Sequence, residues 1–124
     1  MRKREIKRGE IYCAELLGIG NQQTGIRPVI IYSNNKNNEF SPTVNIIPLS
    51  TDLRKLCVHV LIEGYGLKEP SMALLEQITT INKTQLRGKI GTISDEDMAR
   101  VDRAADIQFD RTVSIVKEEV FGAA

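Results

Sequence analysis

The sequence predicts a small, mainly β, partly open barrel that is followed by one C-terminal helix. Three observations support this prediction. Short runs of apolar and β-branched residues alternate with turns that contain glycine or proline, which is typical of an all-β domain. The hydrophobic period changes to that of a helix only after Ile93. The chain has 124 residues, a length that suits one compact domain spanning residues 1–124.

Three strands are predicted in the first half of the chain, at residues 9–17, 29–32 and 44–49. Residues 18–25 (GIGNQQTG) contain three glycines and no apolar period, which indicates a long, mobile connection after the first strand. The pair Arg27-Pro28 favours an extended chain at the entrance to the second strand, whose residues are mostly β-branched. The polar run 33–38 (SNNKNN) is interpreted as a turn before the third strand.

Three more strands are predicted in the second half, at residues 56–62, 72–81 and 89–93. Two turns that contain Gly64, Gly66 and Pro70 separate the first two of them. Asn82 and Gln85 then have the spacing of a short, capped helical turn, which we expect between the last two strands.

A helix is predicted from about residue 95 to at least residue 107. Ser94 and Asp97 have the spacing of a capping box at its start. The apolar residues that follow recur at helical spacing, at Met98, Val101, Ala105 and Phe109. Three carboxylates crowd the first turn, Asp95, Glu96 and Asp97. Favourable charge at a helix N-terminus explains them without a metal ion, so we expect no metal site there.

The composition is that of an ordinary globular protein, and the charge is distributed unevenly along the chain. Apolar residues make up 41% and charged residues 27%, which excludes a disordered or fibrous protein. Residues 1–94 contain 13 Lys and Arg and 8 Asp and Glu, a net charge of +5; residues 95–124 contain 4 and 8, a net charge of −4. A phosphate-binding face set apart from an acidic helix would produce this asymmetry, and so would a solvated surface without a function.

The cysteines and the N-terminus bear on the compartment. Cys13 and Cys57 lie far apart and lack a metal-ligand spacing, so we expect small buried side chains rather than a disulfide or a zinc site. Residues 1–8 are charged, with no apolar stretch after them, unlike a secretory signal. No run approaches the ~18 apolar residues of a membrane span. We therefore expect a cytoplasmic protein that does not contact a membrane.

Six motifs in a fixed order extend over nearly the whole chain: KRGEIY (7–12), GIRPVII (25–31), FSPT (40–43), IPLS (47–50), LLEQI (74–78) and ISDEDMARVDRAA (93–105). In these motifs the chain resembles the MazF/PemK (also called Kid) family of toxins. The resemblance implies a homodimer of SH3-like barrels and an endoribonuclease that cleaves single-stranded mRNA without a metal ion or cofactor, which inhibits translation. It also implies a cognate MazE-like antitoxin that blocks the RNA site.

Cleavage of RNA without a metal ion normally uses the neighbouring 2′-hydroxyl as the nucleophile. The enzyme must orient this hydroxyl, stabilise a dianionic phosphorus centre and help the 5′-oxygen to leave. A pair of histidines would be the obvious acid and base, but the chain has one histidine, His59, inside a predicted strand. We expect His59 to be a packed or surface strand residue rather than the catalytic base.

Arg27 is the first catalytic candidate, because a guanidinium can donate to two phosphate oxygens at once and keeps its charge. We assign it transition-state stabilisation first and proton transfer to the leaving oxygen second. The resemblance implies a second catalytic residue at the end of the third strand, where the family has a Thr. Here that position is Ser50, with Thr51 next to it. Either hydroxyl could position the reacting groups, and we expect it to be that of Ser50.

Amide and hydroxyl side chains are candidates for reading base edges, because they both donate and accept hydrogen bonds. They are Asn21, Gln22, Gln23, Ser33, Asn34, Asn35 and Gln77. Ordinary turn chemistry would account for any one of them. Aromatic residues make up only 5% of the chain, which disfavours a sequence-blind stacking platform and favours some sequence selectivity.

Two alternatives belong to other functional classes. A CcdB-like gyrase-binding toxin without nuclease activity would share the barrel, but that family ends in a Trp-bearing tail. This chain contains no Trp and ends Phe121-Gly122-Ala123-Ala124. A catalytically silent SH3-like adaptor or DNA-binding repressor would not need Arg27 and Ser50 on the two sides of one groove.

Overall fold

The computed structural model describes residues 5–111. The seven strands are β1 (Glu10–Leu17), β2 (Thr24–Ile31), β3 (Thr43–Ser50), β4 (His59–Ile62), β5 (Ser71–Leu74), β6 (Thr79–Asn82) and β7 (Leu86–Thr92). The helical elements are α1 (Asn35–Phe40), the 3₁₀ turns η1 (Leu75–Gln77) and η2 (Lys83–Gln85), and α2 (Asp95–Gln108). The predicted mainly β fold with a helix after the last strand is confirmed.

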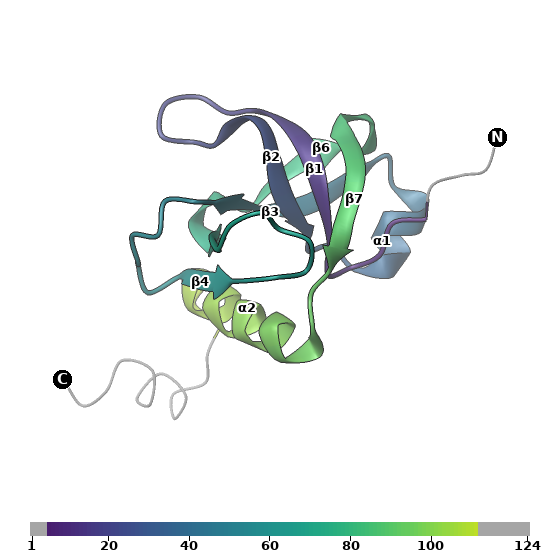
Figure 1. Cartoon of the computed structure of the whole chain (residues 1–124). Coiled ribbons are helices and arrows are strands. Elements are labelled where there is room, and N and C mark those ends of the chain that lie inside the picture. Colours follow the sequence, from purple (N-terminus) through teal and green to yellow (C-terminus); the bar gives the residue numbers. More distant parts are fainter. Residues whose placement is uncertain (1–4, 112–124) are drawn as a thin grey trace.

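The strands form one antiparallel sheet that curls on itself without closing. Its order is β4-β5-β3-β2-β1-β7, and β6 pairs with β3 beside this path. Each ladder is antiparallel, as expected for strands joined by short connections. The outer strands β4 and β7 are not paired with each other in the described part of the chain, so the predicted partly open barrel is confirmed. Figure 1 shows this curled sheet, with α2 below β4.

β3 has different partners along its length, and this feature corrects one prediction. Its first four residues pair with β6, and its last two, Leu49 and Ser50, pair with β5. The single strand predicted over 72–81 is therefore wrong: the chain turns at η1 so that the strands before and after the turn reach different parts of β3. Alternation along one strand cannot reveal such a change of partner.

Other boundaries differ in smaller ways. The predicted polar turn at 33–38 is largely the helix α1, whose first turn is capped by the Asn34 side chain as it accepts from the Asn37 N–H. The fourth strand begins at His59 rather than at residue 56, and the last strand begins earlier than expected, at Leu86. The helical turn predicted after Asn82 is confirmed as η2, with the expected capping box to Gln85.

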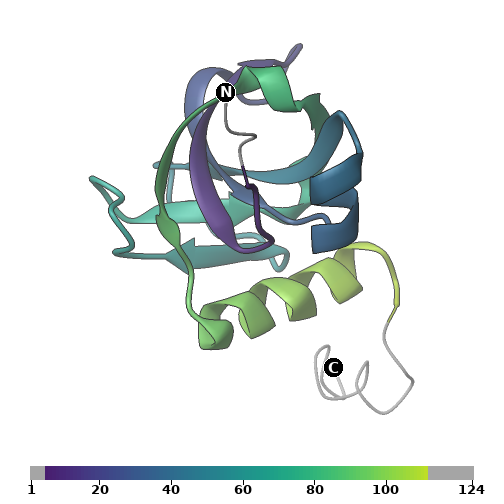
Figure 2. The same ribbon diagram turned by 90° about the vertical axis from the view of Figure 1, so that its right-hand side faces the viewer.

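Two apolar cores lie on the two faces of the curled sheet. On β1, Ile11 belongs to one core, and Tyr12 and Ala14 belong to the other. Successive side chains of a strand point to opposite faces, so both faces of β1 are buried. α2 covers the first core with Met98, Val101, Ala104 and Ala105. Figure 2 shows the helix from the side, beneath the curled sheet. Phe109 does not continue this apolar stripe, because the helix ends at Gln108 and Phe109 is half exposed.

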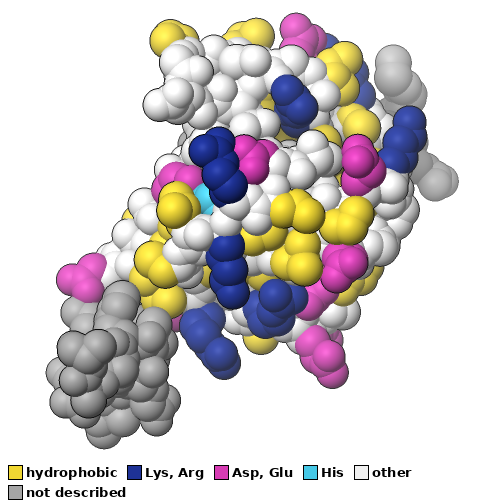
Figure 3. Space-filling model, turned by 60° about the vertical axis from the view of Figure 1, so that its left-hand side comes forward, with side chains coloured by type: hydrophobic (Ala, Val, Ile, Leu, Met, Phe, Trp, Pro, Cys, Tyr) yellow, Lys and Arg dark blue, Asp and Glu magenta, His cyan; other side chains and the backbone are white. Residues whose placement is uncertain are grey.

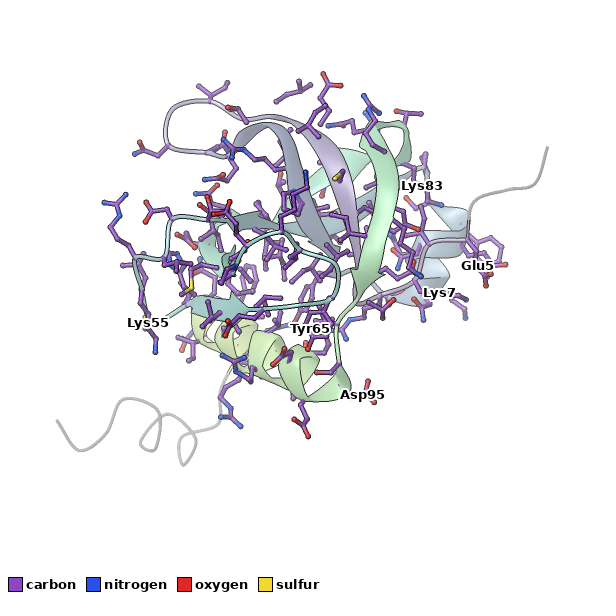
Figure 4. All side chains as sticks on the ribbon, in the orientation of Figure 1. Glu5, Lys7, Lys55, Tyr65, Lys83 and Asp95 are labelled. Atoms are coloured by element: carbon purple, nitrogen blue, oxygen red, sulfur yellow. The ribbon has the colours of Figure 1, made fainter. Side chains whose placement is uncertain are left out.

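Polar contacts fasten α2 to the barrel at its start, in its middle and through Arg100, whose Nη1 donates to the Leu61 carbonyl of β4 at 3.1 Å. At its start, the Ser94 side chain caps the helix by accepting from the Asp97 N–H, as predicted. The Tyr65 hydroxyl donates to Asp97, and Figure 4 shows Tyr65 next to this first turn. This hydrogen bond holds the pKa of the Asp97 carboxyl below its usual value. In the middle of the helix, Asp102 accepts from the Tyr32 hydroxyl and from Arg8, both at 2.6 Å.

The cysteines are both free thiols in different settings. Cys13 is partly buried in β1, whereas Cys57 is exposed on the connection between β3 and β4, so its expected burial is wrong. Because that connection lies outside the ladders, its residues are not covered by neighbouring strands. In residues 5–111 no helix is long and apolar enough to cross a membrane.

Candidate active site

A cavity of about 370 Å³ opens at the end of β3, and we name it the Ser50 pocket. The β1–β2 connection, the β3–β4 connection, the start of β4 and η1 surround it. Figure 1 shows that the two connections extend to the same side of the molecule. The polar and charged residues that line it are Asn21, Gln23, Ser50, Asp52, Arg54, His59, Glu76 and Gln77.

The change of partners along β3 produces this pocket. β2 pairs with β3 only as far as Val29 and Pro48, and beyond that point β3 pairs with β5. Ser50 lies where the two ladders separate, and it is buried, with 9% of its surface exposed. Its hydroxyl accepts from the Asp52 N–H at 3.2 Å. Thr51 is exposed and does not line the pocket, so of the two candidate hydroxyls only that of Ser50 faces it.

Arg27 does not line this pocket. Its Nε donates to the Thr24 carbonyl at 2.9 Å, and in the described residues both terminal nitrogens of its exposed guanidinium lack a partner. Continuing the β2–β3 register by two residues beyond Val29 and Pro48 places Arg27 opposite Ser50. Both side chains then belong to the same sheet face, because each lies two residues from that pair.

His59 and Glu76 form a pair on the wall of the pocket. The His59 Nε2 lies 2.8 and 3.0 Å from the two carboxylate oxygens of Glu76. Its Nδ1 lies 3.0 Å from the Arg54 carbonyl oxygen, to which it donates when it carries the proton, and 3.3 Å from the Leu56 nitrogen, whose N–H it accepts when it does not. Only 8% of the His59 side chain is exposed, against 31% of that of Glu76. His59 therefore joins the β3–β4 connection to η1 and leaves the Glu76 carboxylate accessible.

The β3–β4 connection adds a second charged pair. The Arg54 guanidinium donates to the Asp52 carboxylate at 2.8 Å, and these hydrogen bonds lower the pKa of the Asp52 carboxyl. The Arg54 side chain is 88% exposed, so an anion in the pocket can compete for it. Figure 3 shows the single His side chain of the described residues, in cyan, bordered by both basic and acidic groups.

Gln77 fastens the β1–β2 connection over the pocket. Its Oε1 accepts from the Gln23 N–H at 2.9 Å, and its Nε2 donates to the Asn21 carbonyl at 3.3 Å. The connection also closes on itself, because the Gln22 side chain accepts from the Ile19 N–H. β2 begins at Thr24, so the connection is shorter than the predicted 18–25.

The structure separates the predicted RNA-reading residues into two groups. Asn21, Gln22, Gln23 and Gln77 lie at or next to the Ser50 pocket. Ser33, Asn34 and Asn35 follow the opposite end of β2 and line neither that pocket nor its neighbour. They have structural partners there: Ser33 bonds the buried Asn38, Asn34 caps α1 and Asn35 accepts from the Arg8 N–H.

The sequence reasoning missed Asp52, Arg54 and Glu76 as site residues. Asp52 and Arg54 directly follow the predicted catalytic strand end, a signal that could have indicated them. Glu76 is next to the predicted Gln77, but the contact that makes it distinctive joins residues 17 positions apart and is visible only in the fold.

The comparisons with known proteins identify the class. A family model described as a PemK-like, MazF-like toxin of a type II toxin–antitoxin system matches residues 7–109. The chain is 41% identical over 107 residues to the endoribonuclease EndoA of Bacillus subtilis (strain 168), covering 82% of this chain and 92% of that protein. It is 40% identical over 107 residues to the endoribonuclease MazF of Staphylococcus epidermidis, covering 82% and 89%.

Solved structures agree in fold. MazF (Form-I) from Deinococcus radiodurans superposes with a TM-score of 0.77 at 13% identity, covering 87% of this chain and 99% of that one. An endoribonuclease in complex with its cognate antitoxin from Mycobacterial species gives 0.75 at 23% identity, covering 87% and 98%. The barrel thus has the fold of these toxin structures. The chain belongs to the MazF/PemK family of toxins of type II toxin–antitoxin systems. This assignment favours the endoribonuclease over the CcdB-like alternative.

Proposed function

We propose that this toxin-family endoribonuclease cleaves single-stranded mRNA with some sequence selectivity, without a metal ion, and so inhibits translation. The observation that supports this proposal is the Ser50 pocket, where a buried hydroxyl, an accessible carboxylate and an exposed guanidinium line one open cavity. Arg27 would lie across from Ser50 if the β2–β3 register continued beyond Val29 and Pro48, and both its terminal nitrogens are available in the described residues. These groups are sufficient for a reaction that uses the 2′-hydroxyl of the substrate.

In this reaction the 2′-oxygen attacks the adjacent phosphorus as its proton passes to the Glu76 carboxylate. A P–O2′ bond forms and the P–O5′ bond breaks, which leaves a 2′,3′-cyclic phosphate and a departing 5′-oxygen that takes a proton from water. A carboxylate held in place by a second side chain is suited to accept the proton, and His59 holds Glu76 at 2.8 Å.

Arg27 stabilises the negative charge that develops on the phosphoryl oxygens, because its planar donors match two oxygens at once. Ser50 positions the 2′-hydroxyl or a phosphate oxygen rather than acting as a base, since a hydroxyl is a weak base at neutral pH. Arg54 is a second cation for the phosphate, although its present partner is Asp52.

The proposal that cleavage needs no metal ion rests on the side chains that could bind one. Within residues 5–111 no group of three or more His, Cys, Asp and Glu side chains has a geometry that could hold a metal ion. The test is cleavage of a long RNA by the purified protein in excess EDTA. We expect discrete fragments with 5′-hydroxyl and 2′,3′-cyclic phosphate ends. Activity that appears only after Mg²⁺ is added would contradict the mechanism.

The biological setting is also a proposal. We place the enzyme in the cytoplasm, where mRNA is available, and expect a cognate MazE-like antitoxin to inhibit it by covering the RNA site. Some of the similar structures are MazE–MazF complexes from Deinococcus radiodurans. The product of a gene adjacent to that of this toxin should abolish cleavage at a fixed molar ratio, and an unrelated acidic protein should not.

A further inference from the structure

A second cavity lies on the other side of Gln23 and Gln77 from the Ser50 pocket. It measures about 300 Å³, and it lies between the β1–β2 connection, β6 and η2. We name it the neutral cleft. Gln23 and Gln77 line both cavities, so they form the partition between the two. A ligand that extends from the Ser50 pocket past this partition enters the neutral cleft next.

The two cavities differ in charge. None of the side chains that line the neutral cleft is ionisable, whereas Asp52, Arg54, His59 and Glu76 line the Ser50 pocket. A phosphate is bound by cationic side chains and oriented amide donors. The charged cavity is therefore suited to the RNA backbone, and its neighbour is suited to an uncharged group.

The neutral cleft has an apolar floor and a polar rim. Leu16, Pro48 and Ile81 are buried and form the floor. Amide and hydroxyl side chains surround it, and β6 contributes its outer edge, since β6 pairs only with β3 in the described residues. A nucleobase has the matching chemistry, because its faces are apolar and its edges donate and accept hydrogen bonds.

Some of the rim groups already have partners in the protein. The Gln77 amide bonds the β1–β2 connection, and the Gln85 amide bonds Asn82 and Glu15. Three groups are among those available in the described residues: the Nε2 of Gln22, whose Oε1 accepts from Ile19, the side-chain amide of Gln23 and the hydroxyl of Thr79. Gln23 belongs to the partition, whereas Gln22 and Thr79 line only the neutral cleft and would face the edge of a base bound there.

We infer that the neutral cleft binds one unstacked nucleobase next to the scissile phosphate, and that Gln22 and Thr79 read its edge. This inference rests on the proposed function, because it assumes that the scissile phosphate occupies the Ser50 pocket. It assigns selectivity for one position of the RNA to a cavity outside the reacting groups.

The experiment combines base removal in the RNA with blocking of the cleft in the protein. The substrates are short single-stranded RNAs that contain a sequence cut by the wild-type enzyme, each with one abasic nucleotide at a different position. The variants are Thr79→Trp, which fills the cleft, and Thr84→Trp, a matched change at an exposed residue of η2 that does not line it. Single-turnover cleavage rates are measured for every combination.

For the wild type and Thr84→Trp, loss of the base at one position beside the cut should slow cleavage by about tenfold. Thr79→Trp should slow cleavage of the intact RNA by a similar factor, and this variant should cleave the RNA that lacks the base at that one position no more slowly than the intact RNA. At the other positions, loss of the base should slow this variant by the same factor as it slows the wild type.

A Thr79→Trp variant that cleaves intact RNA at the wild-type rate, or that shows the same abasic losses as wild type at every position, would overturn the inference alone. If this variant does not fold, Thr79→Val replaces it, with Thr84→Val as its control. Thr79→Val should change the base preference at that position by about threefold, and an unchanged preference would overturn the inference. A wild-type enzyme that cuts none of the RNAs would overturn the proposed function itself.

Discussion

Arg27 is an exposed residue with a fixed backbone and a side chain that has few partners. Its backbone is fixed in the β2 ladder, whereas its guanidinium makes a single hydrogen bond, to the Thr24 carbonyl. The side chain can therefore turn toward a phosphate opposite Ser50 at the cost of one exposed hydrogen bond, which contributes about 1 kcal/mol or less.

Replacement of Arg27 should affect the chemical step. We expect Arg27→Ala to lower single-turnover cleavage by ~10²–10³-fold, the usual scale for losing a preorganised donor to the developing charge. Arg27→Lys should recover little of this loss, because an ammonium cannot bind two oxygens in one plane. Thermal unfolding of both variants should match wild type. A Lys variant with nearly wild-type turnover would contradict the assigned role.

Ser50 and Thr51 provide a test of which hydroxyl is used. Ser50 is buried and lines the pocket, whereas Thr51 is exposed outside it. Ser50→Ala should lower turnover by about tenfold, the cost of one lost hydrogen bond in the reacting complex, with RNA affinity nearly unchanged. Ser50→Thr should keep activity, and so should Thr51→Ala. Single-turnover rates decide: an inactive Thr51→Ala together with an active Ser50→Ala would reverse the assignment.

Glu76 is the proposed proton acceptor, and Glu76→Gln removes its basicity while an amide oxygen can still accept from His59. We expect turnover to fall by ~10²–10⁴-fold, the range for losing a general base. Glu63→Gln is the matched control, because Glu63 is exposed and lies outside the Ser50 pocket. If Glu76→Gln keeps wild-type turnover, Glu76 serves only to hold His59 in place.

At the scale of the elements, α2 depends on the contact between Tyr32 and Asp102. Partial burial and the hydrogen bond to Asp102 raise the pKa of Tyr32 to about 12. In the unfolded chain a tyrosine titrates near 10. Between pH 10 and 12 the unfolded state therefore loses a proton that the folded state retains, so the free energy of unfolding falls as the pH rises.

Tyr32→Phe should remove this part of the pH dependence. Urea unfolding at pH 9 and pH 11.5 should show a smaller loss of stability for the variant than for the wild type. At pH 8 the variant should be less stable by about 1 kcal/mol, the contribution of one hydrogen bond. Equal pH dependence in the two proteins would mean that the Tyr32 proton is not linked to folding.

The elements that the sequence predicted correctly are those whose signal is local. Alternation identified β1 and β3, and the cap at Ser94 with the apolar period identified α2. The division of 72–81 into β5 and β6 was missed because it depends on which part of β3 each strand meets. α1 was missed because its six residues (NKNNEF) have no apolar period.

The same distinction applies to the candidate site. The motif order led to Ser50 and the amide chemistry to Gln77, and the structure places both at one pocket. Ser33, Asn34 and Asn35 were proposed from residue type alone, and the structure gives them partners at the other end of β2. The pairing of His59 with Glu76 could not be read from the sequence, since it is created by the approach of β4 to η1.

At the scale of the whole molecule, we propose a homodimer, as the resemblance implies. Residues Met72–Leu75 and the apolar side of α2 are buried within one chain and offer no surface to a partner. The large apolar side chains that remain exposed are Leu17, Ile19, Ile26, Phe40, Leu53, Leu56, Leu61 and Phe109. Of these, Leu61 lies in the edge strand β4 and Leu56 shortly before it, and apolar side chains gathered at one edge favour association.

A symmetric pair is the commonest way to cover such surface. Light scattering at micromolar concentration should give twice the mass of one chain, and dilution should not separate the pair above the nanomolar range. Replacing the exposed Leu61 and Leu56 by Ser should weaken association more than the same changes at Leu17 and Ile19, because only the former lie beside the edge strand β4. A strictly monomeric mass would contradict the proposal.

Because β3 pairs with β6 along its first half and with β5 at its end, the chain tolerates insertions and deletions only outside this strand. An added or deleted residue within Thr43–Ser50 would exchange the faces of one half of the strand relative to the other and turn Ser50 away from its pocket. The exposed part of the β3–β4 connection, residues 51–57, has no ladder to preserve. Natural insertions and deletions should therefore accumulate in this connection, where they would reshape the entrance for RNA while the reacting groups stay in register.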